Sequence, residues 1–225
     1  MNHFDFVRDE LLPSLLKGTV ATVELITVSV PLGLILGTLI AIGRVYGSRL
    51  TRTLCAGYIG FFRGTSLLVQ LFILYYGLPS VGIYLSAFAA AVTGFSLCSS
   101  AFHAEYIRGA IQSIQVGQMM AAEAIGMSRF TAISSIILPQ ALRRAIPGCS
   151  NEIIYLIKYS SLAFMVTVVE LTGAGKIIAT RYFNYTEVFL VVGVIYLLLV
   201  SGATRALDAL ERRLRFPGMA GSSVV

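Results

Sequence analysis

The sequence has little charge and few of the residues on which soluble or disulfide-linked proteins depend. Only 12% of its 225 residues are charged, there is no tryptophan, and its three cysteines, Cys55, Cys98 and Cys149, are widely separated. Soluble domains carry about twice this charged fraction, so the composition excludes a soluble enzyme and a disordered chain. The isolated cysteines exclude a disulfide scaffold. We expect them to be small apolar residues within helices.

The residues that catalytic and metal sites need are also missing. His3 and His103 lie far apart in the sequence, and no serine occupies a nucleophile-elbow motif. Residues 173–176 read Gly-Ala-Gly-Lys, but Ile177 follows and the earlier glycine of a phosphate-binding loop is absent. We therefore expect no enzyme activity, no metal site and no cofactor in this chain. Any ATP must be bound and hydrolysed by another chain.

Long uncharged segments are what the sequence has instead. Residues 25–43, 64–104 and 188–204 contain no Asp, Glu, Lys or Arg. A helix crosses a membrane in about 20 residues, and residues 64–104 would form a helix about 60 Å long, twice the thickness of the hydrocarbon. A turn is therefore expected near Gly77–Gly82. We predict an all-α integral membrane protein with one transmembrane domain, residues 1–225, and five transmembrane helices at about 20–43, 55–78, 84–104, 151–171 and 187–208.

Basic residues fall mainly on one side of these predicted spans. If the amino terminus faces outside, the inside segments hold Arg44, Arg49, Arg52, Arg63, Arg108, Arg129, Arg143, Arg144, Arg205, Arg212, Arg213 and Arg215. The outside segments hold only Arg8, Lys17, Lys176 and Arg181, and Lys158 falls within a span. Because Lys and Arg accumulate on the cytoplasmic side, we predict an outside amino terminus and a cytoplasmic carboxyl terminus. The net charge of +6 then reflects topology and not a nucleic-acid surface.

The predicted cytoplasmic loop, residues 105–150, is long enough to have a function of its own. We predict a helix from Ile111 to Ile125 that ends at Gly126, a following turn that begins at Ser128, and stops near Pro139 and Pro147. Composition alone favours a helix lying on the membrane surface. Such helices usually carry Lys or Arg, however, and residues 109–128 have none, which favours a protein partner.

Several segments in order along the chain match a known family. They include Gly117-Gln118, Ala121-Ala122, Ala124-Ile125-Gly126, Ile136-Ile137-Leu138-Pro139-Gln140-Ala141, Phe62-Arg63-Gly64-Thr65, Ala104-Glu105 with Arg108-Gly109, and Leu210-Glu211-Arg212-Arg213. The sequence thus resembles permease subunits of ATP-binding-cassette (ABC) importers, especially the polar amino acid branch, which includes histidine, glutamine, arginine and cystine permeases. The resemblance implies the type I importer permease fold in a bacterial inner membrane.

The resemblance also implies partners and a coupling helix. The partners are an ABC ATPase dimer that binds ATP and Mg²⁺, a second permease subunit (identical or related), a solute-binding protein and membrane lipid, with no nucleic acid. Coupling to the ATPase is assigned to Gly117, Met120, Ala121, Ala122, Glu123, Ala124 and Gly126. This sequence departs from the family at Met120, where Glu is usual, and Glu123 stands one turn later on nearly the same face. Cys98 stands where Asn is usual, and Tyr159 where Asp is usual.

A site for a polar solute must use the few polar groups of the spans, because charges in hydrocarbon are costly and turn inward. The candidates are Thr65, Gln70, Cys98, Ser99, Lys158, Tyr159, Ser160 and Ser161. The alternative for the hydroxyls is a bond to their own helix backbone, and for Lys158 it is snorkelling. Glycine pairs at Gly33 and Gly37 and at Gly60 and Gly64 predict close packing between helices.

We therefore expect a permease subunit that translocates a polar amino acid or related small solute by alternating access. The solute would come from a solute-binding protein, and a separate ATPase would drive the cycle. An ion-coupled secondary transporter is the alternative. Such proteins usually hold carboxylates within their spans, whereas Glu24, Glu152, Glu170 and Glu187 each lie close to a predicted membrane boundary.

Overall fold

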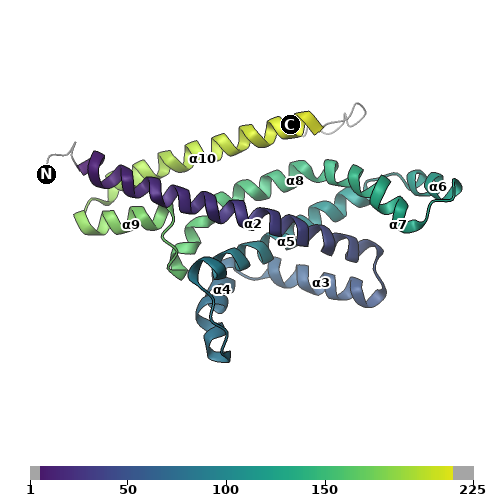
Figure 1. Cartoon of the computed structure of the whole chain (residues 1–225), viewed down its shortest axis with the longest axis horizontal. Coiled ribbons are helices and arrows are strands. Elements are labelled where there is room, and N and C mark those ends of the chain that lie inside the picture. Colours follow the sequence, from purple (N-terminus) through teal and green to yellow (C-terminus); the bar gives the residue numbers. More distant parts are fainter. Residues whose placement is uncertain (1–5, 215–225) are drawn as a thin grey trace.

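The computed structural model describes residues 6–214, and every regular element in that range is helical. Its longest helices are α2 (Leu12–Tyr46), α5 (Ala87–Gln112), α8 (Leu138–Tyr159) and α10 (Tyr185–Leu214), which run along the long axis of the molecule (Figure 1). Three helical segments are long and apolar enough to cross a membrane, or five if each of two bent pairs is one span. The all-α membrane class is confirmed, and the count of five stays a prediction. His3 and Arg215 lie outside the described residues.

The second predicted span, 55–78, is wrong as a single straight helix. α3 (Arg49–Gly64) meets the helical segment 67–81 at 102°. That segment comprises α4 (Leu67–Phe72) and two short turns, η2 (Ile73–Gly77) and η3 (Leu78–Val81), and it projects away from the bundle (Figure 1). The extended backbone of Thr65 and Ser66 interrupts the helix. The turn expected near Gly82 is confirmed, because Gly82 has φ +83° and ends η3.

The fourth predicted span, 151–171, belongs to a much longer helical run. α7 (Arg129–Ala132) and η4 (Ile133–Ile137) continue directly into α8, which ends in the tighter turns of η5 (Ser160–Val166). The stops predicted near Pro139 and Pro147 are both wrong. Pro139 lies in the first turn of α8, where η4 already precedes it, and Pro147 lies inside the helix. Ala141, Ala145 and Cys149 of the same helix are buried in a core cluster. This packing stabilises the helix although each proline lacks a backbone N–H to donate.

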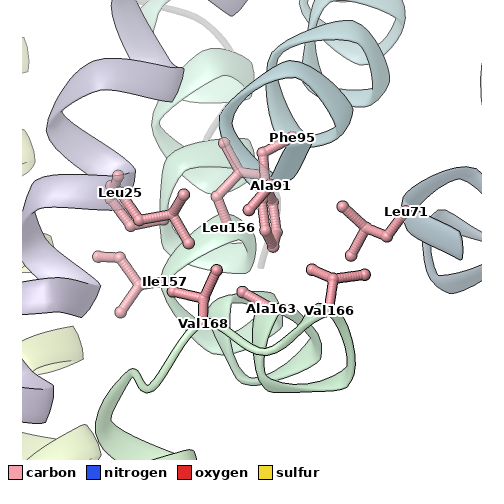
Figure 2. Packing of buried hydrophobic residues seen from close by; sticks show 10 residues of the cluster. Leu25, Leu71, Ala91, Phe95, Leu156, Ile157, Ala163, Val166 and Val168 are labelled. Atoms are coloured by element: carbon pink, nitrogen blue, oxygen red, sulfur yellow. The ribbon is translucent and has the colours of Figure 1, made fainter. Parts of the chain in front are cut away.

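A central apolar cluster joins five elements of the chain. Leu25 of α2, Leu71 of α4, Phe95 of α5, Leu156 of α8 and Val166 of η5 are all buried in it (Figure 2). Leu71 therefore fastens the projecting α4 to the bundle. The cluster fixes the positions of the bend after α3 and of the carboxyl end of α8, where most of the candidate solute-binding residues lie.

Glycines bring α2 and α5 into close contact. A Cβ on Gly37 would lie 2.7 Å from Cβ of His103 and 2.8 Å from the carbonyl oxygen of Ser100, so neither atom leaves room for a side chain. Close packing at Gly33 and Gly37 is thus confirmed. The prediction for Gly60 and Gly64 is wrong within the described chain, where a Cβ at either position meets nothing within 4 Å.

The two ends of the molecule differ in what they contain. The amino-terminal end of α2, α9 (Leu171–Tyr182) and the start of α10 lie at one end, and α6 (Val116–Ala124) and α7 lie at the other (Figure 1). The turn between α2 and α3 lies at the α6 end (Figure 1), and Arg44 of α2 and Arg49 and Arg52 of α3 flank it. This cluster of three arginines and the segment with the predicted coupling residues therefore share one end.

Candidate functional site

The short helix α6 is isolated by a break on each side. α5 ends at Gln112, so the predicted start at Ile111 is wrong. Ile111 and Ile114 pack into a core cluster with Ile137 instead. At the other end Gly126 has φ +79°, and the next amide, of Met127, donates to the carbonyl of Ala122 at 3.0 Å. The predicted stop at Gly126 is thus confirmed and has a physical cause, since glycine adopts this left-handed conformation at little cost.

Ser128 begins the next helix as predicted. Its Oγ accepts a hydrogen bond from the amide of Thr131 at 3.2 Å, which caps α7. The connection between α6 and α7 is therefore short, and its conformation is fixed by Gly126 at one end and by the Ser128 cap at the other. This arrangement fixes the position of α6 relative to the long run that continues into α8.

Most of α6 faces away from the rest of the chain. Ala122 is buried and Met119 is half-buried, whereas Val116, Met120 and Ile125 expose 76%, 64% and 77% of their surface. The remaining predicted coupling residues are also exposed, namely Gly117, Ala121, Glu123, Ala124 and Gly126. A Cβ at Gly117 meets nothing within 4 Å. Ala122 alone of the predicted set points into the protein, so it supports α6 and does not present a contact surface.

A cavity of about 340 Å³ lies behind α6. It is lined by residues of five elements (α2, α5, α6, α7 and η4), including Tyr46, Met119, Glu123, Arg129 and Ile137. Glu123 and Arg129 thus border the same cavity, and Met120 is not among its lining residues. Although Met120 and Glu123 are close on the helix surface, the structure gives them different surroundings.

An ion cluster joins α3 and α5 near the carboxyl end of α5. Arg108 donates two hydrogen bonds to the carboxylate of Glu105, at 2.9 and 2.8 Å, and a nitrogen of Arg63 lies 3.9 Å from the same carboxylate. Arg63 also lies over the ring of Phe102, 5.1 Å from its centre. The spacing of Glu105 and Arg108 on one helical face was the available sequence signal. Arg63 belongs to a segment that is distant in the sequence, so its place in the ion cluster could not be inferred from residue spacing.

Three of the predicted solute-binding residues meet at the bend after α3. The side-chain amide of Gln70 donates to the Phe62 carbonyl at 3.1 Å and to the Thr65 hydroxyl at 2.8 Å, and Sγ of Cys98 lies 4.0 Å from the same carbonyl. The Thr65 hydroxyl also donates to the Phe61 carbonyl at 2.8 Å, which is the backbone alternative. Gln70 is buried, and its Oε1 has no hydrogen-bond partner among the described residues.

The serines of the predicted site mostly bond to their own helices. Ser99 is fully buried where α5 meets Gly33 of α2, so it belongs to the packing of those two helices. Ser160 is also buried, and its hydroxyl donates to the Ile157 carbonyl at 2.8 Å. Ser161 donates to the Lys158 carbonyl at 3.1 Å. The structure therefore does not bring these hydroxyls together with the group around Gln70.

Lys158 and Tyr159, by contrast, are exposed on α8. The ammonium of Lys158 lies over the ring of Tyr155, 4.4 Å from its centre, and the rings of Tyr155 and Tyr159 stack with centres 6.0 Å apart. Asn151 is exposed one turn earlier. These residues form a polar stripe on the surface of α8: Asn151, Tyr155, Lys158 and Tyr159.

Glu170 forms a buried network that sequence spacing does not reveal. It caps α9, and its carboxylate accepts hydrogen bonds from the amides of Thr172 (2.9 Å) and Gly173 (2.8 Å) and from the hydroxyl of Tyr196 (2.9 Å). Tyr196 lies on α10 and also contacts the hydroxyls of Thr172 and Ser160. The structure shows that Glu170 is a fully buried carboxylate that joins α9 to α10, and its position near a membrane boundary stays a prediction.

Comparisons with known proteins agree with this architecture. The family described as "Binding-protein-dependent transport system inner membrane component" matches residues 29–216. The chain is 41% identical over 204 residues to the probable amino-acid ABC transporter permease protein YckA of Bacillus subtilis, covering 91% of this chain and 90% of that protein. It is 44% identical over 197 residues to the probable amino-acid ABC transporter permease protein PatM of Vibrio harveyi, covering 86% and 88%. A solved structure described as an amino acid ABC transporter with histidines superposes with a TM-score of 0.84 at 31% identity, covering 95% of this chain and 99% of that one.

Proposed function

Because the chain belongs to the family of inner membrane components of binding-protein-dependent transport systems, we propose that it is the permease subunit of an ATP-driven importer for a polar amino acid or related small solute. A solute-binding protein delivers the solute from outside, and a separate ABC ATPase dimer hydrolyses ATP in the cytosol. A second permease subunit, identical or related, completes the pathway. The amino terminus faces outside and α6 faces the cytosol, which the arginines at the α6 end support.

One observation carries the proposal: α6 is a short helix with a small-residue face that nothing in the described chain covers. Gly117, Ala121 and Ala124 leave this face nearly flat, and Met120 adds exposed apolar surface beside them. Small residues let a second surface approach closely. An exposed apolar patch at the end of a helical bundle is typical of a protein contact site.

The structure connects α6 to the membrane-spanning part of the chain in two places. Before α6, Arg144 of α8 donates hydrogen bonds to the carbonyl oxygen of Ser113 at 2.7 Å and to its hydroxyl at 3.0 Å. After α6, residues 129–159 form one uninterrupted helical run, about 45 Å long at 1.5 Å per residue. A displacement of α6 by the ATPase would therefore be transmitted along α8 to Lys158 and Tyr159.

The candidate solute contacts divide into two groups under this proposal. Lys158 and Tyr159 line the pathway directly. Thr65, Gln70 and Cys98 hold the bend after α3 and shape the pathway from beneath its surface, since Gln70 is buried. Ser99, Ser160 and Ser161 have their hydroxyls bonded to backbone carbonyls and contribute to packing of the helices beside the pathway.

The test perturbs the α6 face without touching the bundle. Ala121→Arg places a long cation on that face, and Thr180→Arg places the same side chain on an exposed position of α9 at the opposite end. We expect Ala121→Arg to reduce co-purification of the cognate ABC ATPase and ATP-dependent solute uptake at least tenfold, whereas Thr180→Arg leaves both unchanged. Equal effects of the two variants, or full coupling by Ala121→Arg, would contradict the proposal.

A further inference from the structure

We propose that the cargo of this permease carries a carboxylate that pairs with Lys158 and bears no net positive charge, so that acidic or neutral amino acids are carried and basic ones are rejected. The inference rests on the proposed function and names the charge class of its cargo. It follows from two observations. Lys158 is the exposed charged residue between residues 145 and 175, and its ammonium already lies over the neighbouring ring of Tyr155.

Only three charged residues lie between residues 145 and 175: Glu152, Lys158 and Glu170. Glu152 is 5% exposed and Glu170 is fully buried, while Lys158 is exposed. The exposed surface of this part of the chain therefore carries one formal charge, and that charge is positive. Among the described residues, no carboxylate forms an ion pair with the Lys158 ammonium.

The polar stripe on α8 does not suit contact with lipid. The exposed face of α2 presents apolar side chains such as Leu32, Ile35 and Leu39, as expected for a surface in hydrocarbon. The stripe instead presents Asn151, Tyr155, Lys158 and Tyr159. Polar and charged groups within spans turn toward a protein interior or a water-filled path, so this side of α8 faces the pathway.

The distance from Lys158 to the basic residues at the α6 end of α8 opposes snorkelling to the cytoplasmic surface. Lys158 lies fourteen positions beyond Arg144, about 21 Å along α8 at 1.5 Å per residue. Its ammonium lies over Tyr155, one turn back toward the cytoplasmic end, which is the direction that helical side chains take. A lysine side chain spans only about a turn of helix, so the ammonium remains at the depth of the stripe.

Tyr155, the ring beside Lys158, is already engaged and is a poor site for a cationic cargo. A ring face attracts a cation, but Lys158 already occupies a face of Tyr155, and Tyr155 and Tyr159 stack on one another. A cationic side chain entering this region would meet the like charge of Lys158 and find no exposed carboxylate on α8 or η5. A carboxylate, in contrast, gains a charge-assisted hydrogen bond from the ammonium.

The test measures uptake of three radiolabelled probes, L-glutamate, L-glutamine and L-arginine. It uses the native host from which this permease gene has been deleted, complemented with the wild-type chain or a variant, so that all partner subunits are present. The variants are Lys158→Met, Lys158→Arg and Lys158→Glu. Lys176→Met serves as the matched control, because Lys176 is an exposed lysine of α9 that also lies over a ring, that of Phe164 at 5.4 Å.

With the wild-type chain we expect permease-dependent uptake of glutamate or glutamine at least tenfold above that of arginine. Lys158→Met should lower that uptake at least tenfold, Lys158→Arg should retain most of it, and Lys158→Glu should shift the preference toward arginine. Lys176→Met should match the wild type. Co-purification of the ATPase with every variant shows that the importer is assembled.

Two outcomes overturn the inference in distinguishable ways. Arginine uptake equal to or above that of glutamate and glutamine would refute the charge class while leaving the importer function standing, and so would unchanged uptake by Lys158→Met. Permease-dependent uptake of none of the three probes would overturn the inference for glutamate and glutamine, and loss of ATPase co-purification would contradict the importer function itself.

Discussion

Replacing Glu170 by alanine should destabilise the chain strongly although the residue lies far from α6. The change removes the acceptor for the buried amide of Gly173 and the partly buried amide of Thr172, and each unsatisfied buried donor costs about 1–3 kcal/mol. The hydroxyl of Tyr196 also loses this acceptor but keeps its contact with the hydroxyl of Thr172 at 3.0 Å. We expect a loss of about 4 kcal/mol, which lowers the melting temperature by roughly 10 °C for a chain of this size.

The measurement is thermal unfolding of the purified chain in detergent, followed by the fraction that remains monodisperse after heating. Glu170→Gln retains one acceptor oxygen and should lose about half as much. Glu24→Ala, at an exposed glutamate of α2, controls for removing a carboxylate from a helix surface. A melting temperature of Glu170→Ala within 2 °C of the wild type would refute the role assigned to this network.

Two further predictions concern packing and helix capping. Gly37→Leu should prevent assembly of a stable bundle, because even a Cβ at this position would lie 2.7 Å from the Cβ of His103. Gly57→Leu should be tolerated, because a Cβ there meets nothing within 4 Å. The membrane-inserted yields of the two variants are compared, and equal yields would contradict the close contact of α2 and α5. Ser128→Ala removes the cap bonded to Thr131 and should lower the stability of α7 by about 1 kcal/mol. Hydrogen exchange should become faster at the start of α7 and stay the same in α10. Unchanged exchange in α7 would show that the cap contributes nothing.

The sequence predicts well the features that depend on local pattern. Uncharged segments indicate the membrane class, and Gly82, Gly126 and Ser128 indicate a turn, a helix end and a cap, because each of these depends on a residue's own conformation or its nearest neighbours. Proline predicts less reliably here. Pro139 and Pro147 both lie within a helical run, since tertiary packing of the residues around them outweighs one missing hydrogen bond.

Features that depend on distant contacts were not predictable from one sequence. The 102° bend after α3 is held by the Gln70 side chain bonded to the Phe62 carbonyl, and nothing in the spacing of these residues requires it. Glu170 and Tyr196 meet only because α9 and α10 pack together. Lys158 was predictable as a candidate from its type and position, whereas its exposure and its contact with Tyr155 required the structure.

Site-specific photo-crosslinking tests whether α6 contacts an ATPase in the cytosol. A photoreactive benzoylphenylalanine at position 121 samples the outer face of α6, and the same residue at position 177 samples the exposed face of α9. We predict an ultraviolet-dependent adduct between position 121 and the ABC ATPase subunit, and none from position 177. An adduct with the ATPase from position 177 alone, or labelling of position 121 only by a membrane-impermeant reagent added outside, would contradict the account.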